Sequence, residues 1–237
     1  MGQGDAVIPT LIVDEGMLFC PQFRLVTEYR TAIGSNTVRI TDRVTNLGST
    51  PSEMELLYHC NFGSPFLDEE AQLILPAAAT IPRDAGAATS IDSWASYRAP
   101  TPGYVEQCYW HVPLADANGN TVALLANAAQ SIGVAVRTNI TQMPCFTQWK
   151  NTGAQSDGYV TGLEPGTNYP NGRDFERRQG RVVTLAPGQE YRVDLALEVC
   201  EGPERVTAVK QEIAAIQGDT VATVHREPVA GYSDLGD

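Results

Sequence analysis

The feature that most constrains the fold is an alternation of apolar and polar residues, with a period of two, that runs through most of the chain between turn signals. In the clearest stretch, 190–199, the apolar residues from Tyr191 to Val199 fall on one face and charged residues fall on the other. Pro187-Gly188 turns the chain just before it. Successive side chains of a strand point to opposite faces, so the pattern predicts strands buried on one side.

The same pattern predicts about eleven strands and almost no helix. The expected strands are 6–13, 17–32, 36–46, 53–60, 71–76, 104–113, 121–127, 131–140, 144–149, 180–186 and 190–199. In 36–46, Asp42 falls in register with the apolar residues, so either that strand twists or Asp42 faces a polar pocket. One helix is expected at 203–217, where Val206, Val209 and Ile213 recur at helical spacing after Pro203.

The chain is predicted to form one domain. No internal repeat or flexible linker divides residues 1–217, and 218–237 reads as a polar, acidic tail. The block 76–103 is rich in Ala, Pro and Asp and predicts a long surface loop. We therefore expect a single antiparallel, all-β domain of sandwich or barrel type with a short C-terminal helix.

Charge and cysteine content exclude several classes of function. The 16 Lys+Arg against 28 Asp+Glu give a net charge of −12, which disfavours nucleic-acid and anionic membrane partners. Five widely spaced cysteines without a C-x-x-C pair indicate reduced thiols, no zinc site and a cytoplasmic location. No stretch has the pattern of a secretion signal or a membrane span.

Among the three histidines, His59 is the strongest candidate for chemistry. It follows an apolar stretch and precedes Asn61 and Gly63, so its imidazole is expected at a strand end, where pockets are built. A core histidine bonded to a backbone carbonyl is an equally weighted alternative. His111 lies in mid-strand and is expected to be structural or on the surface, and nothing is assigned to His225 in the tail.

Glu164 is the candidate carboxylate. A short strand carries it to Pro165-Gly166, where a turn is expected, and Asn168 follows within reach. A carboxylate on a rigid turn suits general-base chemistry because its geometry and partial desolvation can both tune its pKa. A solvated loop glutamate is the alternative that this segment alone favours.

Two weaker candidates accompany this carboxylate. Glu106 is a charge among aromatic and apolar neighbours at a strand start, although alternation alone could place it outside. Trp149 could provide the stacking face on which sugar C–H groups rest, and a core tryptophan is the equal alternative. The chain lacks the G-x-S-x-G, H-E-x-x-H, phosphate-loop and G-x-G-x-x-G motifs, which leaves nucleotide, hydride and zinc-hydrolase chemistry unsupported.

Taken in order, His59-x-Asn61, Glu106 to Tyr109 and Gly162 to Asn168 on an all-β chain resemble the aldose 1-epimerase (galactose mutarotase-like) superfamily. Four segments resemble more closely one branch of this superfamily, the DUF4432 family: Thr45 to Pro51, Leu57 to Gly63, Trp149-Lys150-Asn151 and Leu163 to Pro170. The resemblance covers about residues 15–200. It implies an antiparallel β-supersandwich whose concave face binds a sugar.

The resemblance also implies residue roles and an activity. Glu164 would take the proton from the anomeric hydroxyl and His59 would protonate the ring oxygen, so that the ring opens and closes to the other anomer. Glu106 would hold sugar hydroxyls in place of the family's aspartate. Asn61, Asn168, Trp149, Lys150 and Arg83 complete the predicted substrate-binding set, and no metal or cofactor is required.

One departure from the superfamily is expected to matter. Relatives carry a further N-terminal segment with strands and site residues, and here Met1 falls where that segment should already have ended, which predicts an N-terminally truncated sandwich. An exposed sheet edge would follow, and with it a homodimer formed through that edge. Two alternatives stay open, a non-catalytic carbohydrate-binding protein and an isomerase or lyase acting on a keto-sugar or uronate.

Overall fold

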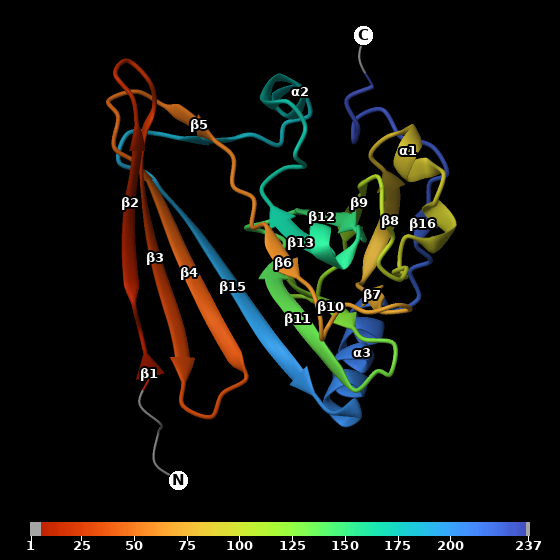
Figure 1. Cartoon of the computed structure of the whole chain (residues 1–237). Coiled ribbons are helices and arrows are strands. Elements are labelled where there is room, and N and C mark those ends of the chain that lie inside the picture. Colours follow the sequence, from red (N-terminus) through yellow and green to blue (C-terminus); the bar gives the residue numbers. More distant parts are fainter. Residues whose placement is uncertain (1–5, 236–237) are drawn as a thin grey trace.

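The computed structural model describes residues 6–235, which are arranged mainly as two antiparallel sheets (Figure 1). Along the larger sheet the strands are β1 (Ala6–Val7), β3 (Gln22–Ala32), β4 (Thr37–Asn46), β15 (Glu190–Glu201), β11 (Ile132–Asn139), β10 (Asn120–Ala126) and β7 (Gln72–Ile74), and β2 (Thr10–Gly16) also pairs with β3. The second sheet has the order β16 (Thr223–Val224), β8 (Ala77–Pro82), β9 (Gln107–Pro113), β12 (Cys145–Asn151), β13 (Val160–Gly166) and β6 (Cys60–Phe62). A short ladder joins β14 (Val183–Leu185) to β5 (Ser52–Met54).

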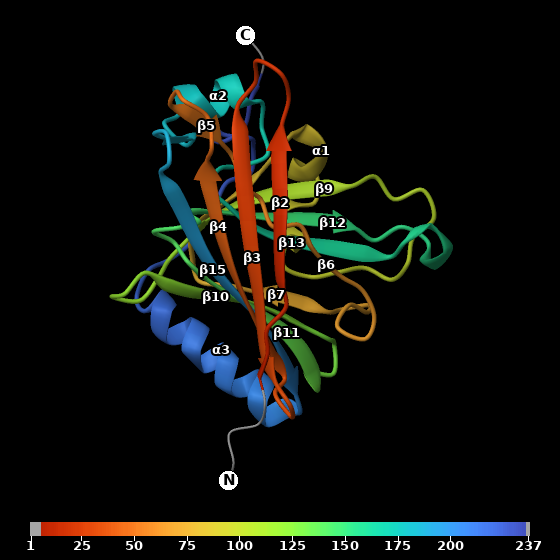
Figure 2. The ribbon, with the colours of Figure 1, turned by 90° about the vertical axis from the view of Figure 1, so that its left-hand side faces the viewer.

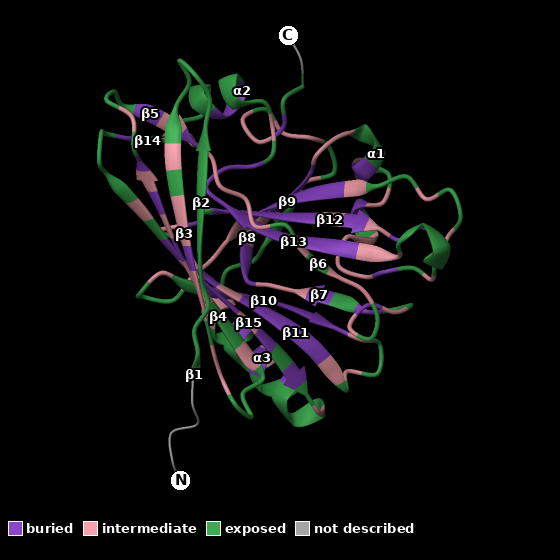
Figure 3. Ribbon diagram, turned by 60° about the vertical axis from the view of Figure 1, so that its left-hand side comes forward, coloured by how far each residue is buried: buried purple, intermediate pink, exposed green. Residues whose placement is uncertain are grey.

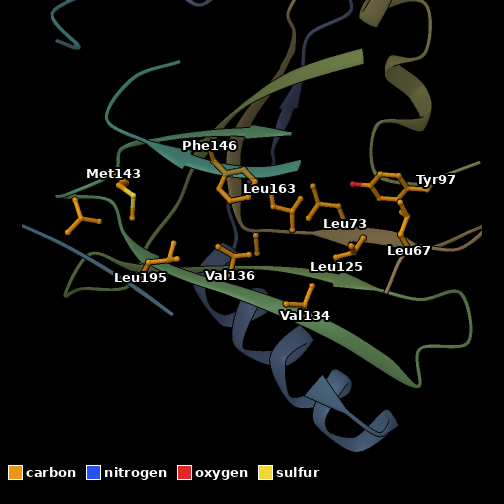
Figure 4. Packing of buried hydrophobic residues seen from close by; sticks show 13 residues of the cluster. Leu67, Leu73, Tyr97, Leu125, Val134, Val136, Met143, Phe146, Leu163 and Leu195 are labelled. Carbon is orange, nitrogen blue, oxygen red and sulfur yellow. The ribbon is translucent and has the colours of Figure 1, made fainter. Parts of the chain in front are cut away.

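The two sheets are held together by an apolar core (Figure 4). Leu125, Val134 and Val136 from the larger sheet pack in one cluster with Phe146 and Leu163 from the second sheet. Burying such side chains stabilises the fold by about 1.5–3 kcal/mol each. Because the strands alternate, the residues between these core positions on β12 and β13 point to the opposite, outer face of the second sheet.

The predicted helix at 203–217 is confirmed as α3 (Pro203–Gln217). Pro203 occupies the first turn, where its missing N–H costs nothing, and Val206, Val209 and Ile213 are buried against β10, β11 and β15. Arg137 of β11 pairs with Glu212 of the helix, which fixes the helix on the outer face of the larger sheet (Figure 2). The all-β expectation with one short C-terminal helix is therefore confirmed.

Several boundaries differ from the sequence prediction. The expected loop 76–103 contains β8, α1 (Ala85–Ala88) and a 3-10 turn at Ile91–Ser93. The expected strand 17–32 begins only at Gln22, and 53–60 is broken, because only Ser52–Met54 and then Cys60–Phe62 form strands. Runs of Ala and Pro carry no period-two signal, which is why β8 could not be recognised.

Polar residues inside the fold resolve two alternatives left by the sequence. Asp42 points into polar surroundings, as one of the two alternatives expected: it is buried and accepts a hydrogen bond from the Tyr58 hydroxyl. His111 is structural, because it is fully buried and contacts Thr80 Oγ1 and Gln148 Oε1 through its two ring nitrogens. Burial lowers the pKa of His111 to about 3, so this imidazole stays neutral at physiological pH.

The tail beyond α3 packs onto the second sheet. Thr223–Val224 adds a parallel strand beside β8, and Trp110 Nε1 donates a hydrogen bond to Ser233 Oγ (3.0 Å). Tyr232 lies against the ring of Tyr169, which follows β13. A further helix, α2 (Arg173–Arg178), contributes Glu176, whose carboxylate pairs with Arg181 in the buried layer beside this tail. The described part of the tail therefore covers the part of the outer face formed by β8 and β9.

Candidate functional site

Strand register brings the candidate residues to the outer face of the second sheet. Glu164 of β13 pairs across from Thr147 of β12, and the next outward position pairs Gly162 with Trp149 and with Asn61 of β6. Directly paired residues of antiparallel strands point to the same face and have Cβ atoms about 4.5–5.5 Å apart. This face therefore collects Glu164, Trp149 and Asn61 from three neighbouring strands.

The centre of the site is a contact between His59 and Glu164. His59 directly precedes β6, and its Nε2 lies 3.0 Å from Glu164 Oε1. The imidazole is 47% exposed, whereas the carboxylate side chain is only 4% exposed. Glu164 Oε1 has no hydrogen-bonding partner among the described residues. The two side chains are therefore within ion-pair distance, but no N–H of the imidazole is aligned for a hydrogen bond to this oxygen. A buried carboxylate thus lies behind an accessible imidazole.

The pKa of Glu164 is raised to about 7, mainly because burial disfavours its charged form and also because of the nearby charge of Glu106. A carboxyl group with this pKa exchanges its proton near neutral pH, as a general base must. The turn expected at Pro165-Gly166 does not occur there, since β13 continues through Gly166. The rigid support of Glu164 is therefore the middle of a strand.

Gly162 leaves the space in which the two groups meet. A Cβ atom at this position would lie 2.3 Å from Glu164 Oε1 and 3.3 Å from His59 Cε1. Real Cβ atoms do not approach a carboxylate oxygen this closely, so any other residue would push the carboxylate away from the imidazole. The glycine in Gly162-Leu163-Glu164 is thus a requirement of the pair rather than of a turn.

Glu106 is held beside this pair by two donors. Its Oε2 accepts a hydrogen bond from Trp149 Nε1 (2.7 Å), and its Oε1 accepts one from Arg83 (3.3 Å). The Trp149 ring in turn lies edge-on to His59, with ring centroids 5.4 Å apart. Glu106 is 47% exposed, and Arg83 is further paired with Asp84. The structure therefore joins His59, Glu164, Trp149, Glu106 and Arg83 in one continuous set of contacts.

Two other predicted substrate-binding residues lie elsewhere. Lys150 follows Trp149 on β12 and so points to the inner face, where its Nζ donates to the carbonyl oxygens of Ser93, Trp94 and Ser96 (2.9, 3.3 and 2.6 Å). Its side chain is buried, and burial lowers its pKa to about 7. The structure therefore corrects the prediction for Lys150: it anchors the segment 93–96 from within the fold.

Asn168 is also outside this set of contacts. Its side-chain amide donates to Glu55 Oε1 (2.9 Å) and to the carbonyl oxygen of Tyr169 (2.8 Å). Glu55 in turn pairs with Arg173, so Asn168 belongs to the joint between β13 and the segment after β5. Asn61, by contrast, is exposed on β6 directly opposite Gly162.

Thr147 was not singled out from the sequence. It lies opposite Glu164 in the ladder, its side chain is buried, and its hydroxyl has no hydrogen-bonding partner among the described residues. Cys108 was also missed, and its thiol accepts a contact from Arg83 (3.0 Å). Only the pairing of β12 with β13 reveals Thr147, because nothing in its local sequence points to a site, whereas Cys108 lies inside the motif Glu106 to Tyr109 but was given no role of its own.

Other features of the described residues set the surroundings of the site. Within 6–235, no group of three or more His, Cys, Asp or Glu side chains could hold a metal ion. None of the helices in that range is long and apolar enough to cross a membrane. Open pockets of about 720, 440 and 830 Å³ are lined by residues other than His59 and Glu164, so they are separate from this site.

Comparison with known proteins shows to which family the chain belongs. Residues 5–199 match the family described as "Domain of unknown function (DUF4432)". The chain belongs to the DUF4432 family. The DUF4432 chain is also similar to the crystal structure of a proposed aldose 1-epimerase from Klebsiella pneumoniae, with 35% sequence identity and a TM-score of 0.92. No curated protein matches the chain.

More distant structures share the fold. A galactose mutarotase-like protein from Clostridium acetobutylicum is 17% identical with a TM-score of 0.59, and it aligns with 85% of this chain and 64% of its own. A proposed aldose 1-epimerase from Escherichia coli K12 is 16% identical with a TM-score of 0.54, and the alignment covers 82% of this chain and 65% of that one. The DUF4432 chain thus has the galactose mutarotase-like fold expected from its sequence.

The lengths of these proteins differ. The alignment with the Klebsiella pneumoniae protein covers 95% of the DUF4432 chain but only 59% of that protein. The chain therefore spans about three fifths of the length of this relative. An activity of the longer proteins can be transferred to this chain only as a proposal.

Proposed function

We propose that this DUF4432 chain binds a sugar on the outer face of the second sheet and interconverts its anomers by acid–base ring opening. The observation that carries the proposal is the 3.0 Å contact between His59 and a buried Glu164 whose pKa is raised to about 7. Two groups in such contact can exchange protons with one small molecule at neutral pH.

The two protein groups would act on two oxygens that share one carbon. Glu164, as the carboxylate, removes the proton of the anomeric hydroxyl, while protonated His59 gives a proton to the ring oxygen and the bond from that oxygen to the anomeric carbon breaks. The resulting aldehyde rotates. Reversal of both proton transfers then closes the ring on its other face and restores both groups. Because the anomeric hydroxyl and the ring oxygen are neighbours, an acid and a base in mutual contact suit this reaction.

The neighbours of the pair supply the contacts that a sugar needs. Glu106 presents a half-exposed carboxylate, fixed by Trp149 and Arg83, that can accept hydrogen bonds from sugar hydroxyls. The partly exposed Trp149 ring offers an apolar surface for sugar C–H groups. Asn61 adds an exposed amide on β6. These side chains need no cofactor for the proposed chemistry.

The test is NMR exchange spectroscopy between the α and β anomers of a panel of aldoses. The purified chain should raise the exchange rate above the uncatalysed rate, and Glu164→Gln should lower this catalysed rate by at least about 100-fold. The matched control is Glu227→Gln, which changes an exposed glutamate in the tail and should leave the rate unchanged.

Other outcomes distinguish the alternatives. Binding detected by line broadening, with exchange at background for every sugar, would replace the proposal with a non-catalytic carbohydrate-binding function. A product of new constitution from a keto-sugar or a uronate would instead indicate an isomerase or lyase that uses the same base. Retention of full exchange in Glu164→Gln would remove this carboxylate from the mechanism.

A further inference from the structure

The buried hydroxyl of Thr147 is not used by the proposed acid–base pair. Thr147 lies on β12 directly opposite Glu164 of β13, and it is 1% exposed. Figure 3 shows both strands as buried elements of the second sheet. Among the described residues, neither Thr147 Oγ1 nor Glu164 Oε1 has a hydrogen-bonding partner. Buried polar groups without a partner cost free energy, so two of them on directly paired residues need an explanation.

Both oxygens are enclosed by the described residues. Neither Thr147 Oγ1 nor Glu164 Oε1 has appreciable accessible surface, so no water-sized space adjoins either atom in the described part of the chain. A bridging water would need such a space together with two or more polar neighbours. The partner of each oxygen therefore comes from the side chains that already pack around it.

Four side chains surround Thr147 on the outer face of the sheet. They are Glu164 and Trp110 on the two paired strands, and Cys145 and Trp149 on β12 itself. An indole N–H can only donate, and both of these indoles already do so elsewhere. The thiol is a weak hydrogen-bonding group that already contacts a backbone carbonyl. Glu164 is thus the neighbour that offers a strong acceptor oxygen without a partner.

The pairing of the strands puts the two side chains within reach of each other. Directly paired residues of antiparallel strands have Cβ atoms about 4.5–5.5 Å apart. The threonine hydroxyl lies one bond from its Cβ and the glutamate oxygens lie three bonds from theirs, so an O–H···O bond of about 2.7 Å can join them. Rotation about the Cα–Cβ bond of Thr147 exchanges its hydroxyl with a methyl group of similar size, so this needs little repacking.

We propose that Thr147 is the positioning residue of Glu164, through a hydrogen bond between its hydroxyl and the Glu164 carboxyl group. The hydroxyl donates to the carboxylate and accepts from the carboxylic acid, because it has both a proton and lone pairs. It therefore holds Glu164 in both protonation states, as a group that takes up and releases a proton requires. The part of this bond in anomer exchange rests on the function proposed above.

Other titratable and charged groups lie around Glu164. They are His59 before β6, Glu106 before β9, the thiols of Cys60 on β6 and Cys108 on β9, and Arg83 beside Glu106. Burial raises the pKa of the two thiols to about 11 and about 12, so both stay neutral between about pH 5 and pH 9. All five groups are unchanged in the Thr147 variants, so a difference in the pKa of Glu164 between these proteins reports the hydroxyl.

Carbon-13 NMR of the glutamate carboxyl groups tests the bond without any sugar. The Glu164 signal is assigned by its loss in Glu164→Gln. Thr147→Val keeps the shape of the side chain but removes the donor to the carboxylate, so the titration midpoint of Glu164 should rise by at least about one pH unit. Thr147→Ala also lacks the hydroxyl and should raise the midpoint too, whereas Thr147→Ser should keep it near the wild-type value.

Thr152→Val is the matched control. Thr152 is also fully buried, and its hydroxyl also lacks a partner among the described residues, but it follows β12 and is not paired with Glu164. Its substitution should leave the Glu164 midpoint unchanged. An unshifted midpoint in Thr147→Val, or an equal shift in Thr147→Ser or Thr152→Val, would overturn the proposal.

The effect on anomer exchange is read separately. Thr147→Val should move the rise of the exchange rate with pH upward by the same interval as the NMR midpoint, and Thr147→Ser should restore the wild-type profile. A shifted NMR midpoint without anomer exchange would support the hydrogen bond and remove the proposed function. Anomer exchange with an unshifted midpoint would support the function and refute the role of Thr147.

Discussion

Replacing Glu164 by glutamine should make the fold more stable at pH 8 while it removes the proposed base. The Glu164 side chain is 4% exposed, and burial together with the charge of Glu106 raises its pKa from 4.5 to about 7. The folded chain therefore holds this proton more tightly than the unfolded chain does. The stability that the proton provides is complete below pH 4.5 and is lost as the pH rises through 7.

The size of the effect follows from those two pKa values. Each pH unit between them corresponds to about 1.4 kcal/mol, so ionising Glu164 in the folded chain costs about 3 kcal/mol at pH 8 and less than about 1 kcal/mol at pH 5. Glutamine has nearly the same shape and is neutral at both pH values, so the substitution removes the cost.

Urea unfolding at pH 5 and pH 8 measures this difference. Glu164→Gln should gain up to about 3 kcal/mol over the wild type at pH 8, equivalent to about 6–12 °C in Tm, and much less at pH 5. Glu227→Gln, at an exposed tail position, should show no gain at either pH. A gain that is absent, or that is equal at the two pH values, would refute the argument that Glu164 is destabilised by burial of its charge.

Three further predictions concern the site and its support. The catalysed exchange rate should rise with pH through about 7 as Glu164 ionises. Glu106→Gln removes a like charge, so it should move this rise in rate to lower pH. An unshifted pH profile would exclude an effect of the Glu106 charge on the pKa of Glu164. Gly162→Ala should abolish exchange, since its Cβ would meet Glu164 Oε1 at 2.3 Å, whereas Gly153→Ala, with its nearest neighbour at 3.7 Å, should retain it. Lys150→Met should lower the free energy of unfolding by about 1–3 kcal/mol, because three carbonyl oxygens lose their donor, yet leave sugar affinity unchanged in an NMR titration.

The sequence predicted best where a pattern is local. The period of two in 190–199 and the helical spacing after Pro203 correspond to β15 and α3, because each element buries one face along its whole length. The segment 76–103 was predicted wrongly, because its alanines and prolines fit a loop as well as the buried strand β8 that they form. The tail was expected to be polar, and its pairing with β8 could not be seen because Thr223–Val224 carries no strand pattern of its own.

The site shows the same limit. Trp149 and Lys150 were both predicted to bind substrate, although neighbours on one strand must point to opposite faces, and only the packed structure decides which face is free. The contact between His59 and Glu164 depends on β6 pairing with β13, two strands about a hundred residues apart in the chain. Local sequence cannot specify such a pairing, nor the orphaned hydroxyl of Thr147.

The edge-on contact between Trp149 and His59 gives the protein an optical reporter of its own. Trp110 is fully buried beneath the tail, and Trp94 lies against His111, an imidazole that stays neutral down to about pH 3. Trp149 alone among the three indoles contacts the accessible His59, and it donates to Glu106. If the chain binds a sugar as proposed, the ligand should change the emission of this indole, and unlabelled protein could then be titrated with unlabelled sugars in a fluorimeter.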